Sequence, residues 1–194
     1  MLNLFSDLVK QGRIGRLDVV NLEARPEVAK TLGIRTVPWM QIGPFQLTGV
    51  RGREEVLDWI ERVGSRDGMA DYFHNLLRDG HLQDVLAMVR RQPESLAALL
   101  PIVANPEASI NVRIGAGVIF EEFAGQEPLR QLVTRMGELT RHEDARVRAD
   151  ACHYLSLTRS PEAKPFLARC QQDDDGVVRE IAEESLQALE SAAE

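Results

Sequence analysis

One pattern recurs three times in the C-terminal half of the 194-residue chain and constrains its fold more than any other feature. It consists of a Val-Arg pair, a small residue three positions after the Arg, and a large apolar residue four positions further on. The arginines of the three copies are 35 and 31 residues apart, a spacing typical of two-helix repeats. The copies are SINVRIGAGVIFEEF with Arg113, DARVRADACHYLSLT with Arg148 and DGVVREIAEESLQAL with Arg179.

Each copy predicts the second helix of a helix–turn–helix unit. Val, Ala and Phe or Leu at intervals of four form an apolar stripe along one helical face, and the central Ala allows a neighbouring helix to approach closely. Polar turn residues precede each copy, and a further amphipathic stretch precedes each turn, at residues 95–104, 128–139 and 162–170. Residues 69–94 predict one more helix pair, divided at Asp79-Gly80 and without the Val-Arg pair, as is usual for a terminal repeat.

The Asp…Val-Arg…Ala…Leu arrangement resembles the second helix of a HEAT repeat. The resemblance implies that Arg113, Arg148 and Arg179 have a structural role, in which each Arg ties the turn between helices by hydrogen bonding nearby acidic or carbonyl groups. The alternative is that these arginines bind an anionic ligand. Because stacked helix pairs form a long curved surface, the resemblance also implies a scaffold that binds a protein partner.

Residues 1–64 show a different pattern. They predict a helix over 3–12, a buried strand over 17–22 (LDVVNL), a helix from Pro26 to Gly33, two strands over 36–42 and 45–49, and a final helix over 54–63. Val56, Leu57, Ile60 and Val63 are expected to form the inward face of that last helix. The predicted order is therefore helix, strand, helix, strand, strand, helix.

This order, together with the segment Gly33-Ile34-Arg35-Thr36-Val37-Pro38, resembles the later part of a thioredoxin-like domain. The resemblance implies that Pro38 follows a cis peptide bond and that Val37, Pro38 and Trp39 line a substrate groove. In that family a first strand and a CxxC motif precede this segment, and the present chain contains neither. Two hypotheses follow: the fold persists as a docking platform without redox chemistry, or a CxxC is encoded upstream of an incorrectly assigned start at Met1.

The two cysteines, Cys152 and Cys170, form no CxxC motif and are expected to be reduced thiols. Cys170 is expected on an apolar face beside Phe166 and Leu167, and Cys152 is expected to be partly exposed. The alternative is that the two cysteines contact each other. The run from Asp173 to Asp175 predicts a solvated turn with helix-capping carboxylates, since it lacks the ligand spacing of a calcium loop. No motif indicates a metal, a cofactor or catalytic residues.

The charge distribution argues against nucleic acid as a partner. Residues 1–64 contain 9 basic and 8 acidic residues, whereas residues 65–194 contain 14 basic and 22 acidic ones. An acidic repeat region repels phosphate backbones. No apolar run is long enough to span a membrane, and the N-terminal residues do not resemble a signal peptide, so a cytoplasmic location is expected.

The sequence therefore predicts an α+β chain with two domains. Residues 1–64 would form a truncated thioredoxin-like α/β piece and residues 69–194 an all-α, HEAT-like solenoid. The predicted function is a protein-interaction scaffold with a redox-associated domain and no catalytic dithiol. The alternatives are a thiol–disulfide oxidoreductase whose CxxC lies upstream, and a phycobilin lyase of the kind related to HEAT repeats. The oligomeric state is not predicted.

Overall fold

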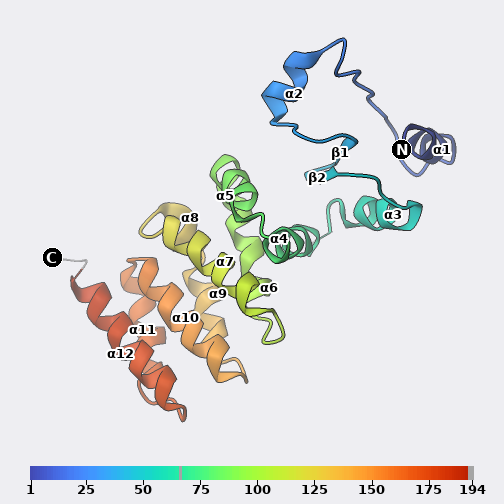
Figure 1. The fold of residues 1–194 in the computed structure, drawn as a ribbon. Helices are drawn as coiled ribbons and strands as arrows, with labels where there is room; N and C mark the ends of the chain where they lie inside the picture. The colour runs from blue at the N-terminus through green and yellow to red at the C-terminus, as the bar shows by residue number, and fades with distance from the viewer. Residues whose placement is uncertain (66, 192–194) are drawn as a thin grey trace. The chain divides into compact units, whose positions relative to one another are not determined.

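The computed structural model describes residues 1–65 and 67–191, and its contacts divide the chain into two units (Figure 1). Unit 1 comprises residues 1–68 and unit 2 comprises residues 69–194. All three copies of the Val-Arg pattern lie in unit 2, whereas the segment that resembles a thioredoxin lies in unit 1.

Unit 1 contains three helices and one β-hairpin among its described residues. Its elements are α1 (Leu2–Lys10), α2 (Pro26–Leu32), β1 (Trp39–Ile42), β2 (Phe45–Thr48) and α3 (Arg53–Arg62). The strands are antiparallel, and their two-residue connection begins with Gly43 at a φ of 56°, a left-handed conformation that favours glycine. The Val37–Pro38 peptide bond is cis, as the resemblance implies.

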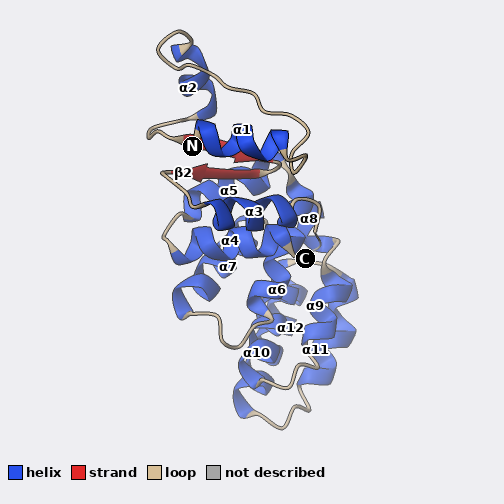
Figure 2. Cartoon of the chain, turned by 90° about the vertical axis from the view of Figure 1, so that its right-hand side faces the viewer, coloured by secondary structure: helices blue, strands red, loops and turns tan. Residues whose placement is uncertain are grey.

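The core of unit 1 lies between the hairpin, α1 and α3 (Figure 2). Phe45 and Trp59 are both buried, and their ring centroids are 5.0 Å apart. The prediction that Val63 faces inward is wrong. Helix α3 ends at Arg62 and Val63 adopts an extended conformation, so its side chain leaves the helical face and Trp59 supplies the buried surface instead.

The predicted strand over residues 17–22 does not form. This segment is irregular, and Val19 is 61% exposed. A strand requires a neighbour that pairs with its backbone groups, but in the described part of unit 1 the only sheet is the hairpin, in which β1 and β2 pair with each other. An apolar run is therefore insufficient here, because no partner strand contacts it.

Unit 2 consists of helix pairs. Helices α4 (Gly68–Arg78) and α5 (Leu82–Arg91) form the first pair, divided near Gly80 as predicted. In the three pairs that follow, the second helices are continuous: α7 (Ile110–Glu122), α10 (Ala145–Leu157) and α12 (Gly176–Ser191). The first helices are made of short pieces: η1 (Pro93–Leu99) with α6 (Leu100–Val103), α8 (Glu127–Arg130) with α9 (Val133–Leu139), and η2 (Pro161–Ala163) with α11 (Lys164–Cys170).

Proline explains two of these interruptions. Helix α6 restarts with Pro101 in its first turn, and α11 restarts with Pro165 in its first turn. Proline has no backbone N–H to donate, so it is tolerated where a helix begins but not in its interior. The sequence predicts one helix for each of these two stretches, and the structure shows a 3-10 segment followed by a short α-helix in both.

The core of unit 2 follows the recurring pattern. The Val and Ala of all three copies are buried, as are Phe120 and Leu155, whereas Leu186 in the third copy is half-buried. Phe120 and Tyr154 contact each other across α7 and α10, with ring centroids 4.8 Å apart. None of the helices in residues 1–65 and 67–191 combines the length and apolar character required to cross a membrane.

Candidate functional site on the helical repeats

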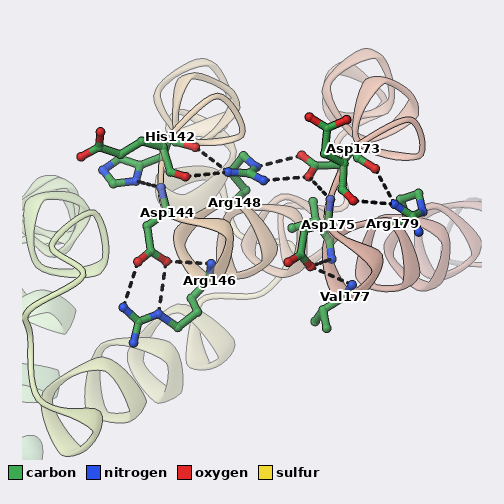
Figure 3. Close-up of polar contacts among 11 residues, drawn as sticks. His142, Asp144, Arg146, Arg148, Asp173, Asp175, Val177 and Arg179 are labelled. Carbon is green, nitrogen blue, oxygen red and sulfur yellow. Dashed lines mark hydrogen bonds and ion pairs between the residues drawn. The ribbon is translucent and has the colours of Figure 1, made fainter.

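The Arg148 side chain donates four hydrogen bonds that join two turns of the repeat array (Figure 3). Its Nε and Nη2 each donate to one carboxylate oxygen of Asp173 at 2.8 Å. Its Nη1 donates to the carbonyl oxygens of His142 and Glu143, each at 2.9 Å. A guanidinium has five N–H donors, so most of this one is committed to the protein, which disfavours the interpretation that Arg148 binds an anionic ligand.

Helices α10 and α12 begin in the same way, because the residues before them repeat a local arrangement. Asp144 precedes α10 and accepts a hydrogen bond from the Arg146 N–H at 2.8 Å; Asp175 precedes α12 and accepts one from the Val177 N–H, also at 2.8 Å. Such carboxylates satisfy N–H groups that have no partner within the helix. Asp175 therefore caps its helix as the sequence analysis predicted for the acidic run.

A second repeated contact lies two residues before each cap. His142 Nδ1 accepts a hydrogen bond from the Asp144 N–H at 3.1 Å, and Asp173 Oδ1 accepts one from the Asp175 N–H at 2.9 Å. His142 and Asp173 thus occupy equivalent positions in successive repeats.

Asp173 has a role that the sequence did not predict. Its carboxylate binds Arg148 of the preceding repeat, while its backbone carbonyl accepts a hydrogen bond from Arg179 Nη1 at 2.7 Å. Its side chain is largely shielded from solvent, with 11% exposed. The Arg148 guanidinium holds the pKa of the Asp173 carboxyl below its usual value, although burial opposes that shift. A signal was present, because Asp173 occupies the position before the third turn that an Arg of the second repeat would meet.

The three recurring arginines are not equivalent. Arg179 donates to the carbonyls of Asp173 and Asp174 in the turn before its helix, as Arg148 does to His142 and Glu143. Arg113 instead forms an ion pair with Asp150 on α10. The turn before its own helix is a longer segment, Asn105–Ser109. In the repeat that follows Arg113, the position that Asp173 occupies in the third repeat is held by His142, which has no carboxylate.

An exposed apolar stripe runs along α7. Its residues are spaced by four, and their exposed fractions are 72% for Ile110, 58% for Ile114 and 38% for Val118. The opposite face of α7 contributes Val112, Ala116 and Phe120 to the core. A helix that is apolar on both faces is normally covered on both. We call Ile110, Ile114 and Val118 the α7 stripe.

The residues proposed for a substrate groove in unit 1 are only partly exposed. Val37 is 67% exposed, whereas Pro38 and Trp39 are half-buried at the start of the hairpin. The sequence has two cysteines, Cys152 and Cys170, and both are in unit 2. Both are buried, so the expectation that Cys152 is partly exposed is wrong. The next residue on α10, His153, is exposed, whereas Cys152 faces Cys170 on α11.

Comparison with known families agrees with this geometry in one part of the chain. Residues 96–187 match a family model described as HEAT repeats. The match begins in η1 and ends within α12, so it includes α7, α10, most of α12 and the contacts of Arg113, Arg148 and Arg179. It lies within unit 2 and therefore gives no support to the thioredoxin-like interpretation of unit 1. Searches among curated proteins and among solved structures find no match.

Proposed function

We propose that this protein is an interaction scaffold that binds a protein partner through the α7 stripe. The HEAT-like repeats support an interaction role in general, and the stripe is the observation that carries this assignment. Buried Val112, Ala116 and Phe120 already stabilise the helix against the core, so exposed apolar residues on the other face are not needed for that packing. Covering them with a partner removes apolar surface from water.

The stripe fits an amphipathic helix of the partner. Ile110 and Val118 are eight residues apart, which corresponds to about 12 Å along the helix axis. A helix that presents apolar residues at intervals of three and four can place them against such a row. Exposed Glu107 and Glu121 lie before and after the stripe in the sequence, and residues 65–194 are acidic overall. The partner helix is therefore expected to carry basic residues beside its apolar face.

The test places a photo-crosslinking amino acid at position 114 and, as a matched control, at position 177 in the full chain. Val177 on α12 is also apolar and is 60% exposed, but it lies outside the α7 stripe. We expect position 114 alone to crosslink one protein partner. The purified partner should then bind Ile114→Glu at least about tenfold more weakly than wild type, because a charge on an apolar contact costs more than about 1.4 kcal/mol. Val177→Glu should bind normally.

Two outcomes would contradict the proposal. Equal crosslinking from positions 114 and 177 would show that the stripe has no preferred role. Crosslinking to a second copy of this chain would show that the stripe is a self-association surface instead.

A second candidate function concerns unit 1, and it depends on the resemblance of residues 33–38. Val37, Pro38 and Trp39 would contact an extended peptide substrate, and exposure of Val37 beside the hairpin supports this assignment. Residues 1–64 contain no cysteine, so this unit would bind a disulfide-containing peptide without reducing its disulfide. In an insulin disulfide reduction assay the chain should show no turnover through unit 1, and Val37→Asp should weaken peptide binding. Peptide binding that is unaffected by Val37→Asp would exclude this groove.

A further inference from the structure

Cys152 and Cys170 meet at the junction between two repeats. Cys152 lies on α10, and Cys170 is the last residue of α11. Both side chains are buried, and each thiol shifts the pKa of the other. The second repeat thus supplies one thiol, and the first helix of the third repeat supplies the other.

Cys170 also borders solvent-accessible space. It lines an open pocket of about 360 Å³ that is otherwise polar, with Thr140, His142, Arg148, Arg169 and Asp173 in its wall. Cys152 does not line this pocket. The two cysteines therefore differ in position, because Cys170, which is 2% exposed, borders the pocket and Cys152 does not.

The groups around Cys170 suit a thiolate. Arg169 Nη2 donates to Thr140 Oγ1 at 2.6 Å, and Thr140 Oγ1 donates its single proton to the Gly137 carbonyl at 2.7 Å. That proton can turn toward a charged sulfur. The pairing with Cys152, the nearby Thr140 hydroxyl and the charge of Arg169 lower the pKa of Cys170, although burial and Asp173 oppose the shift. The same pairing raises the pKa of Cys152.

We propose that Cys152 and Cys170 form an oxidisable dithiol whose oxidant is hydrogen peroxide or a similarly small peroxide. The Cys170 thiolate attacks one peroxide oxygen, the O–O bond breaks, and the product is a Cys170 sulfenic acid; the leaving hydroxide takes a proton and becomes water. The Cys152 sulfur then attacks the Cys170 sulfur, its own proton leaves with the sulfenic hydroxyl as a second water, and a disulfide forms. Two thiols and one peroxide thus give one disulfide and two waters.

The disulfide would link α10 to α11 across the junction. These helices otherwise meet through side-chain packing, with Arg148 and Asp173 close by. A covalent link would restrain the angle between the second and third repeats. The dithiol does not depend on the α7 stripe or on any partner, so either proposal can fail without the other.

The first test uses the wild-type chain. Trypsin separates the two cysteines, because cleavage after Arg148, Arg159, Arg169 and Arg179 places Cys152 in residues 149–159 and Cys170 in residues 170–179. After brief peroxide treatment of the folded protein, mass spectrometry should find these two peptides joined, with the loss of two hydrogen atoms. The double variant Cys152→Ala/Cys170→Ala shows how much oxidation occurs at methionine alone.

The rate distinguishes a reactive thiol from an inert buried one. A lowered thiol pKa raises the thiolate fraction at pH 7, and a weaker nucleophile loses only part of that gain. Cys170 in the folded chain should therefore react at least as fast as the same thiol in urea. A folded protein that reacts more than about tenfold slower than the unfolded chain would overturn the proposal, because that is the behaviour of structural cysteines.

Single variants assign the roles. Cys152→Ala should accumulate a Cys170 sulfenic acid that dimedone traps, and Cys170→Ala should lose the fast reaction. Thr140→Val should move the pH midpoint of the reaction upward, whereas Thr158→Val, which removes another buried hydroxyl at the end of α10, should not. Fast oxidation that persists in Cys170→Ala would show that Cys152 is attacked directly and would overturn the assigned order. Thermal unfolding of each variant identifies any that fail to fold.

Discussion

Two junctions in the repeat array differ although the same sequence pattern builds them. The first junction joins α7 to α10, through Arg113 with Asp150 and through the rings of Phe120 and Tyr154. The second joins α10 to α11 and α12, where Arg148 binds a carboxylate and two carbonyls at once. Position 142 explains the difference, because His142 stands in the second repeat where Asp173 stands in the third. The repeated Arg thus supplies hydrogen-bond donors at both junctions, and the residue in the turn of the next repeat determines which groups accept from them.

The largest expected effect is at Arg148. Arg148→Met keeps the aliphatic stem but leaves the largely shielded Asp173 carboxylate and two turn carbonyls without their donor, so it should lower the free energy of unfolding by about 3 kcal/mol. The matched Arg113→Met should cost about 1 kcal/mol, since Asp150 is about one-third exposed and can be hydrated. Urea unfolding measures both. Equal losses would show that the two junctions do not differ in the way described.

The next effect concerns close packing between first helices at the second junction. A Cβ at Gly137 would lie 2.4 Å from the Phe166 ring, so Gly137→Ala should destabilise the protein by about 2 kcal/mol. At the first junction a Cβ on Gly117 would lie 3.4 Å from the Tyr154 hydroxyl oxygen. Gly117→Ala should change stability by less than about 1 kcal/mol, since helix propensity offsets the contact. Thermal unfolding distinguishes the two, and Phe166→Leu should partly rescue Gly137→Ala.

Acid should weaken the second junction through Asp173. The lowered pKa of Asp173 means that the unfolded chain binds this proton at a higher pH than the folded chain does. The stabilisation is therefore present above the ordinary aspartate pKa of about 3.9 and is lost as the pH falls through the lower folded value. Asp173→Asn lacks this contribution, so the difference in stability between wild type and Asp173→Asn should narrow below about pH 4. A constant difference in urea unfolding from pH 7 to pH 3 would contradict this account.

The sequence predicted the second helices well because three copies of one pattern had to agree. Val112, Val147 and Val178 are buried as the spacing requires. It did not identify Asp173 as the partner of Arg148, because the two residues are 25 positions apart and three successive aspartates favour a solvated turn. Nor could composition show that residues 17–22 lack a paired strand, since a strand depends on its neighbours as much as on its own residues.

The α7 stripe shows a similar limit. Ile110, Ile114 and Val118 lie among other apolar residues in the sequence, so periodicity alone does not separate the face that packs on the core from the face left outside. The fold makes that separation, because Arg113 and Gly117 turn toward α10 and Gly115 toward Leu77. Candidate interaction residues of this kind become visible only when both faces of a helix are known.

The smallest expected effect would convert the first junction toward the second. In His142→Asp, the new carboxylate could accept the Asp144 N–H as Asp173 accepts that of Asp175, and it would stand where the Arg of the preceding repeat finds its partner at the second junction. Arg113 would then have two carboxylates within its surroundings. The free energy of unfolding should rise by about 0.5 kcal/mol, because Asp150 already pairs with Arg113 and a second negative charge is partly repelled.

Combining His142→Asp with Asp150→Ala should remove that repulsion, and the double variant should be more stable than Asp150→Ala alone. If the double variant is no more stable than Asp150→Ala, the turn at residue 142 does not bring its side chain to Arg113, and the backbone path of the longer turn before α7 sets the first junction instead.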